Sequence, residues 1–513
     1  MIGVFLCILK YKLSIILLVN NVINKSIWIN DKVKNGKLER LDKDIECDIL
    51  IIGGGIAGLS VAYQVMDLGK SVVLIEKDWC GMGATSKNTG KLTWMQGLCY
   101  SKLSKNYNDN VAKLYLDSQK EAISIVKKIV EENKIDCHLT KTKAYVFSYT
   151  GTDYDKFNDE VNFYKKYNIK YKLIDKLPFE YPCKYGLQTS DSYEFNPYEY
   201  LVGLKNILKD KISVYEKTRC ISIDKDNNDY VVLVDNGNKI RCKYAVVCSH
   251  YPMFIVPFLI PFKTRVDRFF IGASKSKFDS DIQIISNGKH SISIRYYHDD
   301  REKYLIYGRR NHSITSNLDI RSDYKELSLE YKKYFGRDVD YFYHIHDLMT
   351  YDGLPFIGEV DNNMYICTGF NKWGNTNGTI SGVVIRDLIL GEDNKYIDLF
   401  SPRRGFSFDK IKNLLLYNLE IGTRYVLNKI VVNKSYYDND VMVGFINGKR
   451  CGIYTDGSGI KHIVSNVCPH MKCNLIFNYV DRTWDCPCHA SRFDIDGNVI
   501  CGPSVYDIKV NFD

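Results

Sequence analysis

The pattern of apolar and polar positions is most regular between residues 47 and 78. Residues 48–52 and 71–75 are short runs rich in Ile, Val and Leu, as expected of strands buried in a parallel sheet. Between these runs, apolar residues recur at helical spacing until Gly69, at Leu59, Ala62, Val65, Met66 and Leu68. The pattern predicts a strand, a helix and a second strand in direct succession, which is a βαβ unit.

Similar patterns predict further elements along the chain. Helical spacing of apolar residues occurs at 107–132, 383–390 (where Gly391 ends the helix) and 409–430. Strand-like alternation occurs within 265–307, and β-type runs occur at 441–446 and 452–455 before an Asp456-Gly457 turn. The chain is therefore expected to fold as an α/β region followed by a small region of strands.

The turn between the first strand and its helix carries the sequence GGGIAG, residues 53–58. Gly53 allows the tight turn, Gly55 lets the backbone approach a pyrophosphate, and Gly58 lets the helix pack closely on the strand. The helix N-terminus favours the phosphate charge. Glu76 lies 18 residues beyond Gly58, where its carboxylate would accept the ribose hydroxyls and repel a 2′-phosphate, which disfavours NADP. The unit predicts a dinucleotide site and leaves FAD and NAD open.

The segments after Glu76 favour FAD over NAD. Residues 80–93, CGMGATSKNTGKLT, are rich in small and hydroxyl side chains, where an NAD dehydrogenase would usually continue with its next helix. Two later segments, 351–358 and 367–382, are also rich in glycine. We therefore expect a ligand with a second ring system, and the candidate contacts in these segments are Ser86, Thr89, Gly374, Asn375 and Thr376.

These motifs together resemble those of the FAD-dependent oxidoreductases of the D-amino-acid oxidase and glycine oxidase superfamily, over about residues 25–399. The resemblance implies an extended FAD, with adenine received by the backbone near Cys220 and isoalloxazine beneath Gly374-Asn375-Thr376. A helix beginning near Thr379 would direct its positive N-terminal end at the flavin. The resemblance also implies an interleaved substrate lobe with a large antiparallel sheet.

Three residues of that lobe are candidates for binding a substrate carboxylate: Arg295, His298 and His312. The alternative is that each is an ordinary surface side chain or is already paired within the protein. No residue stands out as a catalytic base, and oxidation of an amine by hydride transfer does not require one.

The C-terminal part of the chain is rich in cysteine, with six of the 16 cysteines between Cys451 and Cys501. Cys468-x-His470 is followed, after 15 residues, by Cys486-x-x-His489. Two cysteines and two histidines in paired loops indicate a metal site, either a structural zinc site or an iron–sulfur cluster.

The two loops have the form C-x-H-x-x-C and C-x-C-H and strongly resemble the Rieske [2Fe–2S] module. The resemblance favours iron and implies that Cys468 and Cys486 bind one iron and that His470 and His489 bind the other. It also implies a Cys473–Cys488 disulfide and a covering loop at Gly502-Pro503. Phe493 occupies the position of a tyrosine that donates to a ligand sulfur in quinol-oxidising members, so we expect a lower reduction potential.

Length, composition and charge bound these expectations. At 513 residues the chain is too long for one core, and 45% hydrophobic residues exclude a disordered or fibrous protein. The net charge of +9 comes with no long basic run, so nucleic acid is not an expected partner. The apolar segment 1–19 is interrupted by Lys10 and Lys12 and is too short to span a bilayer, so we expect a cytoplasmic protein, with an N-terminal anchor as the alternative.

The expected fold is an α/β FAD-binding Rossmann-type domain with an interleaved antiparallel-sheet substrate lobe, plus a small all-β Rieske domain. Its expected divisions are an N-terminal extension (1–24), the oxidoreductase domain (25–399), a linker helix (400–430) and the Rieske domain (431–513). Within the oxidoreductase domain, the nucleotide parts are about 47–106, 196–255 and 350–399, and the substrate lobe is about 107–195 and 256–349.

A flavin accepts two electrons and a [2Fe–2S] cluster carries one, so their combination favours a conversion from two-electron to one-electron chemistry. The expected function is oxidation of a small amine or amino-acid-like substrate, with electrons passing singly through the cluster to a separate acceptor. Two alternatives remain: a reductase in which a donor protein feeds the cluster and the cluster feeds the flavin, and a non-enzymatic protein with a redox-sensing or structural cluster.

Overall fold

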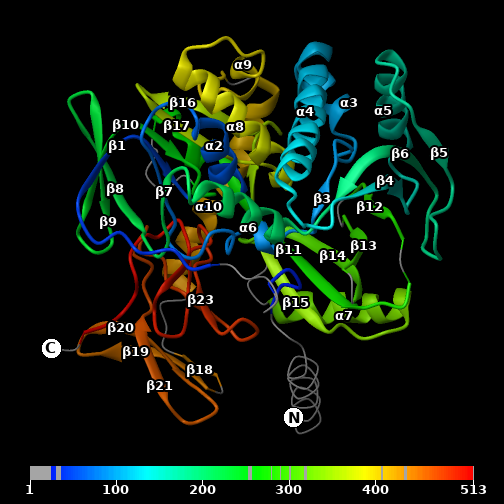
Figure 1. Ribbon diagram of the computed structural model, residues 1–513. Helices are drawn as coiled ribbons and strands as arrows, with labels where there is room; N and C mark the ends of the chain where they lie inside the picture. Colours follow the sequence, from blue (N-terminus) through cyan, green and yellow to red (C-terminus); the bar gives the residue numbers. More distant parts are fainter. Residues whose placement is uncertain are drawn as a thin grey trace, which may run out of the picture.

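The computed structural model (Figure 1) describes residues 25–29, 36–251, 257–278, 280–288, 291–299, 302–316, 320–405, 408–431, 436–438 and 440–511. The N-terminal segment 1–24, expected to be an extension, lies outside these ranges. In the part of the chain that is described, no helix has the length and apolar character needed to cross a membrane.

The predicted βαβ unit forms the centre of a sheet that has eight strands among the described residues. Strand β1 (Ile45–Ile52) pairs in parallel with β2 (Val72–Ile75) on one side and with β10 (Lys239–Val247) on the other. The remaining strands are β7 (Ser213–Tyr215), β8 (Cys220–Asp226), β9 (Asp229–Val234), β16 (Phe356–Asp361) and β17 (Met364–Thr368). The second half of β1 and all of β2 are apolar and buried, because alternate side chains pack into two different apolar groups, one on each face of the sheet.

Two helices that are distant in sequence pack against each other beside this sheet, α2 (Ile56–Val65) and α8 (Gly374–Leu390). Their axes approach closely because α8 carries glycines at the contact: a Cβ on Gly378 would lie 2.7 Å from Ile56 Cγ2, and one on Gly382 would lie 2.5 Å from the Ser60 carbonyl oxygen. Gly391 ends α8 in the left-handed conformation, as predicted.

α8 begins at Gly374, whereas the sequence predicted a helix starting near Thr379. The first turn consists of Gly, Asn and Thr, which have low intrinsic helix propensity. Burial and tertiary hydrogen bonds override that preference, since the Asn377 amide donates to the Phe370 carbonyl (3.2 Å) and the Gln119 amide donates to Asn377 Oδ1 (2.9 Å).

The second sheet has nine strands in the described ranges, in the order β15-β11-β14-β13-β12-β4-β6-β3, with β5 beside β6. The strands are β3 (Lys91–Leu92), β4 (Thr140–Ser148), β5 (Lys172–Ile174), β6 (Tyr185–Glu194), β11 (Thr264–Lys275), β12 (Ile282–Ser286), β13 (Ser293–His298), β14 (Lys303–Ser313) and β15 (Tyr341–Thr350). The sequence predicted an antiparallel sheet; this one is mixed, because β4 and β12 pair in parallel and all its other pairs are antiparallel.

The other helices pack around the two sheets. They are α3 (Cys99–Asn106), α4 (Asp109–Asn133), α5 (Tyr154–Lys166), α6 (Pro197–Leu208), α7 (Ile320–Phe335) and α9 (Ile397–Phe400), with the 3₁₀ turns η1 (Thr85–Lys87) and η2 (Pro257–Lys263). The predicted helix at 107–132 corresponds to α4, whose N-cap Asn108 accepts a hydrogen bond from the Val111 N–H at 2.9 Å.

Helix α10 (Phe408–Val431) leads to the C-terminal region, residues 436–511, drawn in orange and red in Figure 1. This region contains two antiparallel sheets. The first comprises β18 (Tyr436–Asp438), β19 (Val441–Ile446), β20 (Lys449–Thr455) and β21 (Lys461–Ser465); the second comprises β22 (Ile476–Asn478), β23 (Thr483–Asp485), β24 (Arg492–Phe493) and β25 (Val499–Cys501). In Figure 1 the second sheet lies beside β11 and β15, and hydrogen bonds described below join them.

Candidate redox sites

The glycine-rich turn after β1 has the tight geometry that the sequence predicts. Gly53 has φ +112°, and a Cβ there would lie 2.7 Å from the Cys248 carbonyl oxygen. A Cβ on Gly58 would lie 1.8 Å from the Gly53 carbonyl oxygen, so only glycine permits this contact between helix and strand. At Gly55 a Cβ would meet only Thr85 Oγ1, at 3.6 Å, so the protein itself leaves that space open.

Glu76 follows β2 and is bound to the backbone by both carboxylate oxygens. Oε2 accepts a hydrogen bond from the Gly54 N–H (2.7 Å), and Oε1 accepts one from the Asp78 N–H (2.9 Å). Burial raises the pKa of Glu76, while Lys77 and these two donors oppose that effect. Each oxygen keeps a lone pair that a ribose hydroxyl would use.

A large cavity, here called the central cavity, connects most of the predicted nucleotide contacts. Its lining includes Gly53, Gly55, Glu76, Thr89, Cys220, Gly374, Asn375 and Thr376. Gly58 lies behind the turn, as a packing residue should. Ser86 is not part of the lining, because its hydroxyl donates to the Gly83 carbonyl at 3.2 Å, and its neighbour Thr85 lines the cavity in its place.

The start of α8 is tied to the segment after β2. The Asn375 amide donates to the Lys91 carbonyl (2.9 Å), and Asn375 Oδ1 accepts from the Asn88 amide (3.1 Å). The first turn of α8 therefore lies at the cavity wall, where its partial positive charge would stabilise an electron-rich ring system. The cavity has the Glu76 carboxylate near one group of glycines and the N-terminus of α8 near another, an arrangement that fits an extended dinucleotide such as FAD.

None of the three predicted carboxylate-binding residues lines the central cavity. Arg295 is buried, pairs with Glu194 (Nε to Oε2, 3.0 Å) and donates to the Thr89 carbonyl (2.8 Å). His312 Nε2 lies 3.1 Å from Asp323, and His298, the last residue of β13, is half-buried. Arg295 and His312 are therefore paired within the protein, as the alternative held, and Arg295 supports the backbone beneath the Thr89 segment.

Other charged residues line the cavity instead, among them Asp347 of β15 and Lys372. Asp347 lies opposite Asp267 in the β11–β15 register. Burial raises the pKa of Asp347 to about 6, Lys372 lowers it in part, and Asp267 raises it further. In the sequence, this part of the cavity wall is marked by His344-Ile345-His346 before Asp347. Alternation of polar and apolar residues is typical of a strand whose two faces have different surroundings.

The four predicted metal ligands come together in two neighbouring loops of the C-terminal region. The thiols of Cys468 and Cys486 are hydrogen-bonded to each other, and this contact, with N–H donors of the loop, lowers the pKa of Cys468 to about 7 despite burial. The rings of His470 and His489 have centroids 5.0 Å apart. Nδ1 of His489 is buried with no hydrogen-bond partner among the described residues, as expected of an atom that binds a metal.

The spacing of these side chains fits a two-iron cluster better than one zinc ion. Among described residues, no three ligand atoms from these four side chains lie within 4.8 Å of one another, whereas the ligands of one tetrahedral zinc would. The sulfurs of Cys473, Cys486 and Cys488 do lie that close, but Cys473 and Cys488 form a disulfide and so offer no pair of thiolates.

The cluster loops face the flavoprotein part on one side and solvent on the other. Ala490 is packed in an apolar group with Tyr251, Val266, Ile314 and Leu348, and both Tyr251 and Leu348 line the central cavity. His470 is exposed. The C-terminal region also supplies cavity lining itself, through Arg492, Cys501, Gly502 and Ser504.

The two sites define a flavoprotein oxidoreductase that also carries an iron–sulfur cluster. The chain belongs to the family described as FAD dependent oxidoreductase (DAO), whose profile matches residues 48–388, and the profile of the Rieske [2Fe-2S] domain matches residues 428–510. Its cofactors are accordingly FAD and a Rieske [2Fe–2S] cluster.

Similar proteins combine or share these parts. The Rieske 2Fe-2S iron-sulfur protein YhfW of Bacillus subtilis is 30% identical over 91% of this chain and 94% of its own length. Gamma-glutamylputrescine oxidoreductase of Escherichia coli is 21% identical over 76% of this chain and 95% of its own length. The crystal structure of glycine oxidase from Geobacillus kaustophilus shares the fold, with a TM-score of 0.59 and 14% identity, over 71% of this chain and 100% of that one.

Proposed function

We propose that this protein oxidises a small amine or amino-acid-like substrate at FAD and passes the electrons singly through the Rieske cluster to a separate acceptor. The observation that carries the proposal is that Ala490, between the cluster loops and β24, packs on Tyr251 and Leu348, which line the cavity fitted to FAD. A cluster used only to stabilise the C-terminal region would not need a place at that wall.

The chemistry balances with one-electron acceptors. Oxidation of an amine R₂CH–NH₂ to the imine R₂C=NH releases two electrons and two protons, and water then converts the imine to a carbonyl compound and ammonia. FAD supplies the hydride-accepting chemistry. The cluster carries one electron at a time, so the external acceptor is reduced twice for each substrate molecule.

In this proposal the residues named from the sequence hold the cofactors. The nucleotide contacts are Gly53, Gly55, Glu76, Thr89, Cys220, Gly374, Asn375 and Thr376, and the cluster ligands are Cys468, His470, Cys486 and His489. Residues 25–399 form the oxidoreductase domain, 400–430 the linker helix and 431–513 the Rieske domain. The names of gamma-glutamylputrescine oxidoreductase and glycine oxidase support the amine or amino-acid class of substrate.

Anaerobic mixing of the loaded protein with candidate amines and amino acids tests the proposal. We expect the absorbance of the oxidised flavin to be lost first and the cluster to be reduced second. Electron paramagnetic resonance detects the reduced cluster. If an external one-electron donor reduces the cluster first and no amine reduces the flavin, the protein works as a reductase and the proposed direction is wrong.

A further inference from the structure

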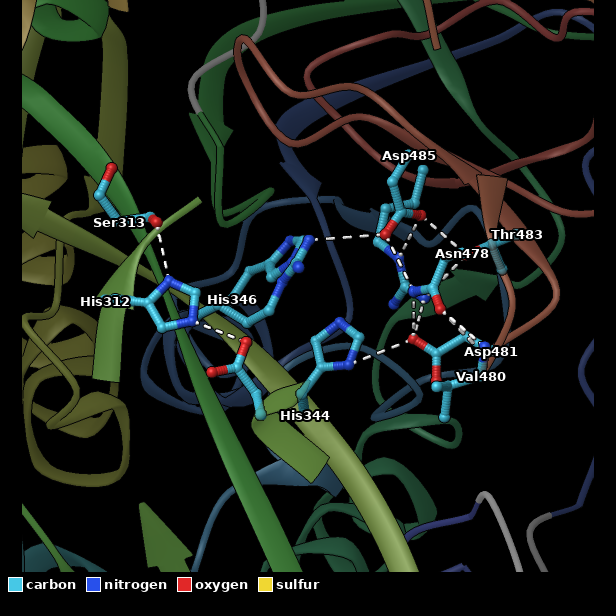
Figure 2. A network of polar contacts seen from close by, with 12 residues as sticks. His312, Ser313, His344, His346, Asn478, Val480, Asp481, Thr483 and Asp485 are labelled. Carbon is cyan, nitrogen blue, oxygen red and sulfur yellow. Dashed lines mark hydrogen bonds and ion pairs between the residues drawn. The ribbon is translucent and has the colours of Figure 1, made fainter. Parts of the chain in front are cut away.

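A group of buried polar side chains joins the nine-stranded sheet to the C-terminal region (Figure 2). Two of its polar contacts cross between them. Arg268 of β11 donates from Nη2 to Asp485 Oδ2 at 3.5 Å, and His344 Nδ1 of β15 lies 3.2 Å from Asp481 Oδ2. The exposed fractions of the Arg268 and His344 side chains are only 7% and 2%. We call Arg268, His344, His346, Asp481, Asp485 and Arg492 the interface network.

The two aspartates are held in place by their own region before they meet the sheet. Arg492 donates to Asp481 from Nη2 (2.6 Å) and to Asp485 from Nε (3.1 Å). Asn478 donates its amide hydrogens to both carboxylates, at 2.9 and 3.1 Å. Each carboxylate is therefore presented to the sheet in a fixed orientation.

Arg268 is held from the other side in the same way. Its Nε donates to His346 Nε2 at 3.3 Å, so this imidazole nitrogen acts as an acceptor. Burial, followed by the nearby cations, lowers the pKa of both histidines well below the usual value: Arg492, Arg268 and Lys87 act on His344, and Arg268, Arg492 and the neighbouring histidines act on His346. The two arginines thus face the two aspartates, and Lys87 acts on the same group as a further cation.

Such a buried set of paired charges acts mainly on geometry. Desolvation offsets much of the attraction between buried ion pairs, so their net effect on stability is small, but leaving one partner unpaired is costly. If the C-terminal region moved away, Arg268 would lose Asp485, and His344 would lose Asp481. The network thus favours one arrangement of the two parts over every displaced one.

The interface network lies next to the contact between the cluster loop and the cavity wall. Leu348 follows His344 and His346 on the same face of β15, because every second side chain of a strand points to the same side. It packs with Tyr251 against Ala490, beside the predicted ligand His489. The network and the contact between the cluster loop and the cavity wall are therefore neighbours on one strand.

We propose that the interface network is an intramolecular docking contact that holds the Rieske cluster at one fixed place beside the flavin, and that Arg268 and His344 are positioning residues for electron exchange between the two centres. This inference rests on the proposed function for the direction of flow but not for the exchange itself. The rate of electron exchange falls steeply with distance, so a fixed contact keeps it fast without a moving domain.

The test uses the full chain loaded with FAD and iron, in the Arg268→Met variant. A light-driven reduction with a deazaflavin as the donor replaces the substrate, and absorbance follows the redistribution of electrons between flavin and cluster. We expect redistribution about tenfold slower or more, with unchanged FAD and iron contents. Hydrogen–deuterium exchange in β23 and β24 should rise. Arg268→Lys, which keeps the charge, should restore part of the rate.

Arg265→Met is the matched control, because Arg265 lies on the same strand and pairs with Asp267 (3.0 Å) in that strand and not across the interface. It should leave the redistribution rate unchanged. If Arg268→Met fails to fold, His344→Gln carries the same test, since Asp481 keeps its bonds to Arg492 and Asn478. The docking contact would be overturned if a folded variant of either residue, loaded with FAD and iron, kept both the electron redistribution rate and the hydrogen–deuterium exchange of the parent protein. Absence of amine oxidation alone would overturn only the proposed function.

Discussion

The FAD site and the cluster site hold their cofactors by opposite means. The predicted FAD contacts in the central cavity are mainly glycines and small polar residues, with the Glu76 carboxylate, drawn from positions as distant as Gly53 and Thr376. The cluster site consists of four side chains within residues 468–489. The two sites should therefore differ in their sensitivity to mutation. Substitution of one ligand should remove the cluster. Affinity for FAD should fall gradually, because it depends on the space left open for the cofactor more than on any one side chain.

The largest expected effect follows from replacing a cluster ligand. Cys486→Ser should abolish binding of both irons and leave FAD content near one per chain, because the two sites share no ligand. Iron, sulfide and flavin analysis of the purified variant measures this. Cys451→Ser is a control in the same region, since Cys451 is buried but is not a predicted ligand. Retention of two irons in Cys486→Ser would contradict the ligand assignment.

Gly55→Ala should weaken FAD binding by about tenfold or more, equivalent to about 1.4 kcal/mol or more. The added Cβ has room within the protein, 3.6 Å from Thr85 Oγ1, but occupies the space needed by the pyrophosphate. Titration of the FAD-free protein with FAD gives the affinity, and the melting temperature without FAD checks folding. Equal affinity in the variant and the parent protein would show that the pyrophosphate lies elsewhere.

Asp347→Asn should raise the dissociation constant of a cationic amine by about tenfold, because a hydrogen bond to a charged group contributes about 1.5–3 kcal/mol. The pKa of Asp347 is raised to about 6, so the carboxylate is charged above that pH and neutral below it. Affinity in the parent protein should therefore fall as pH decreases through about 6, and the variant should lose this dependence. Binding titrations across pH 5–8 measure it; an identical pH profile in both proteins would exclude Asp347 from the substrate contact.

The smallest effect concerns the cluster's reduction potential. Phe493 is fully buried on β24. If Phe493→Tyr places a hydroxyl beside a ligand sulfur, a difference of about 1 kcal/mol between oxidation states would raise the potential by roughly 40 mV. Voltammetry of the loaded variant measures the shift. A potential equal to that of the parent protein, with the cluster intact, would mean that the hydroxyl does not reach the sulfur.

The sequence predicted the local parts of the molecule well and the distant contacts poorly. The βαβ turn and its packing glycines were predictable because their roles depend on neighbours in the chain. The first turn of α8 was not, because its helix is stabilised by partners such as Gln119, which is far away in sequence. The apolar pattern therefore indicated only the later part of that helix, residues 383–390, and the resemblance placed its start too late, near Thr379.

The same reason explains why the sequence left the role of Arg295 open. Alternation on a strand shows that two faces differ, but not which face meets which neighbour. Arg295 meets Glu194, about a hundred positions earlier, and His344 meets Asp481 from the C-terminal region. A single sequence contains no signal that pairs such positions.

In the proposed function, in which electrons leave through the cluster, the exposure of His470 has a consequence for the choice of oxidant. The flavoprotein part and the solvent touch opposite sides of the cluster loops, so an electron carrier can approach His470 without entering the cavity that receives the substrate. The size and shape of the cavity then limit the choice of substrate, but they do not limit the choice of electron acceptor. Under that proposal, a change in the substrate pocket would leave the surface that receives the electron carrier unaltered.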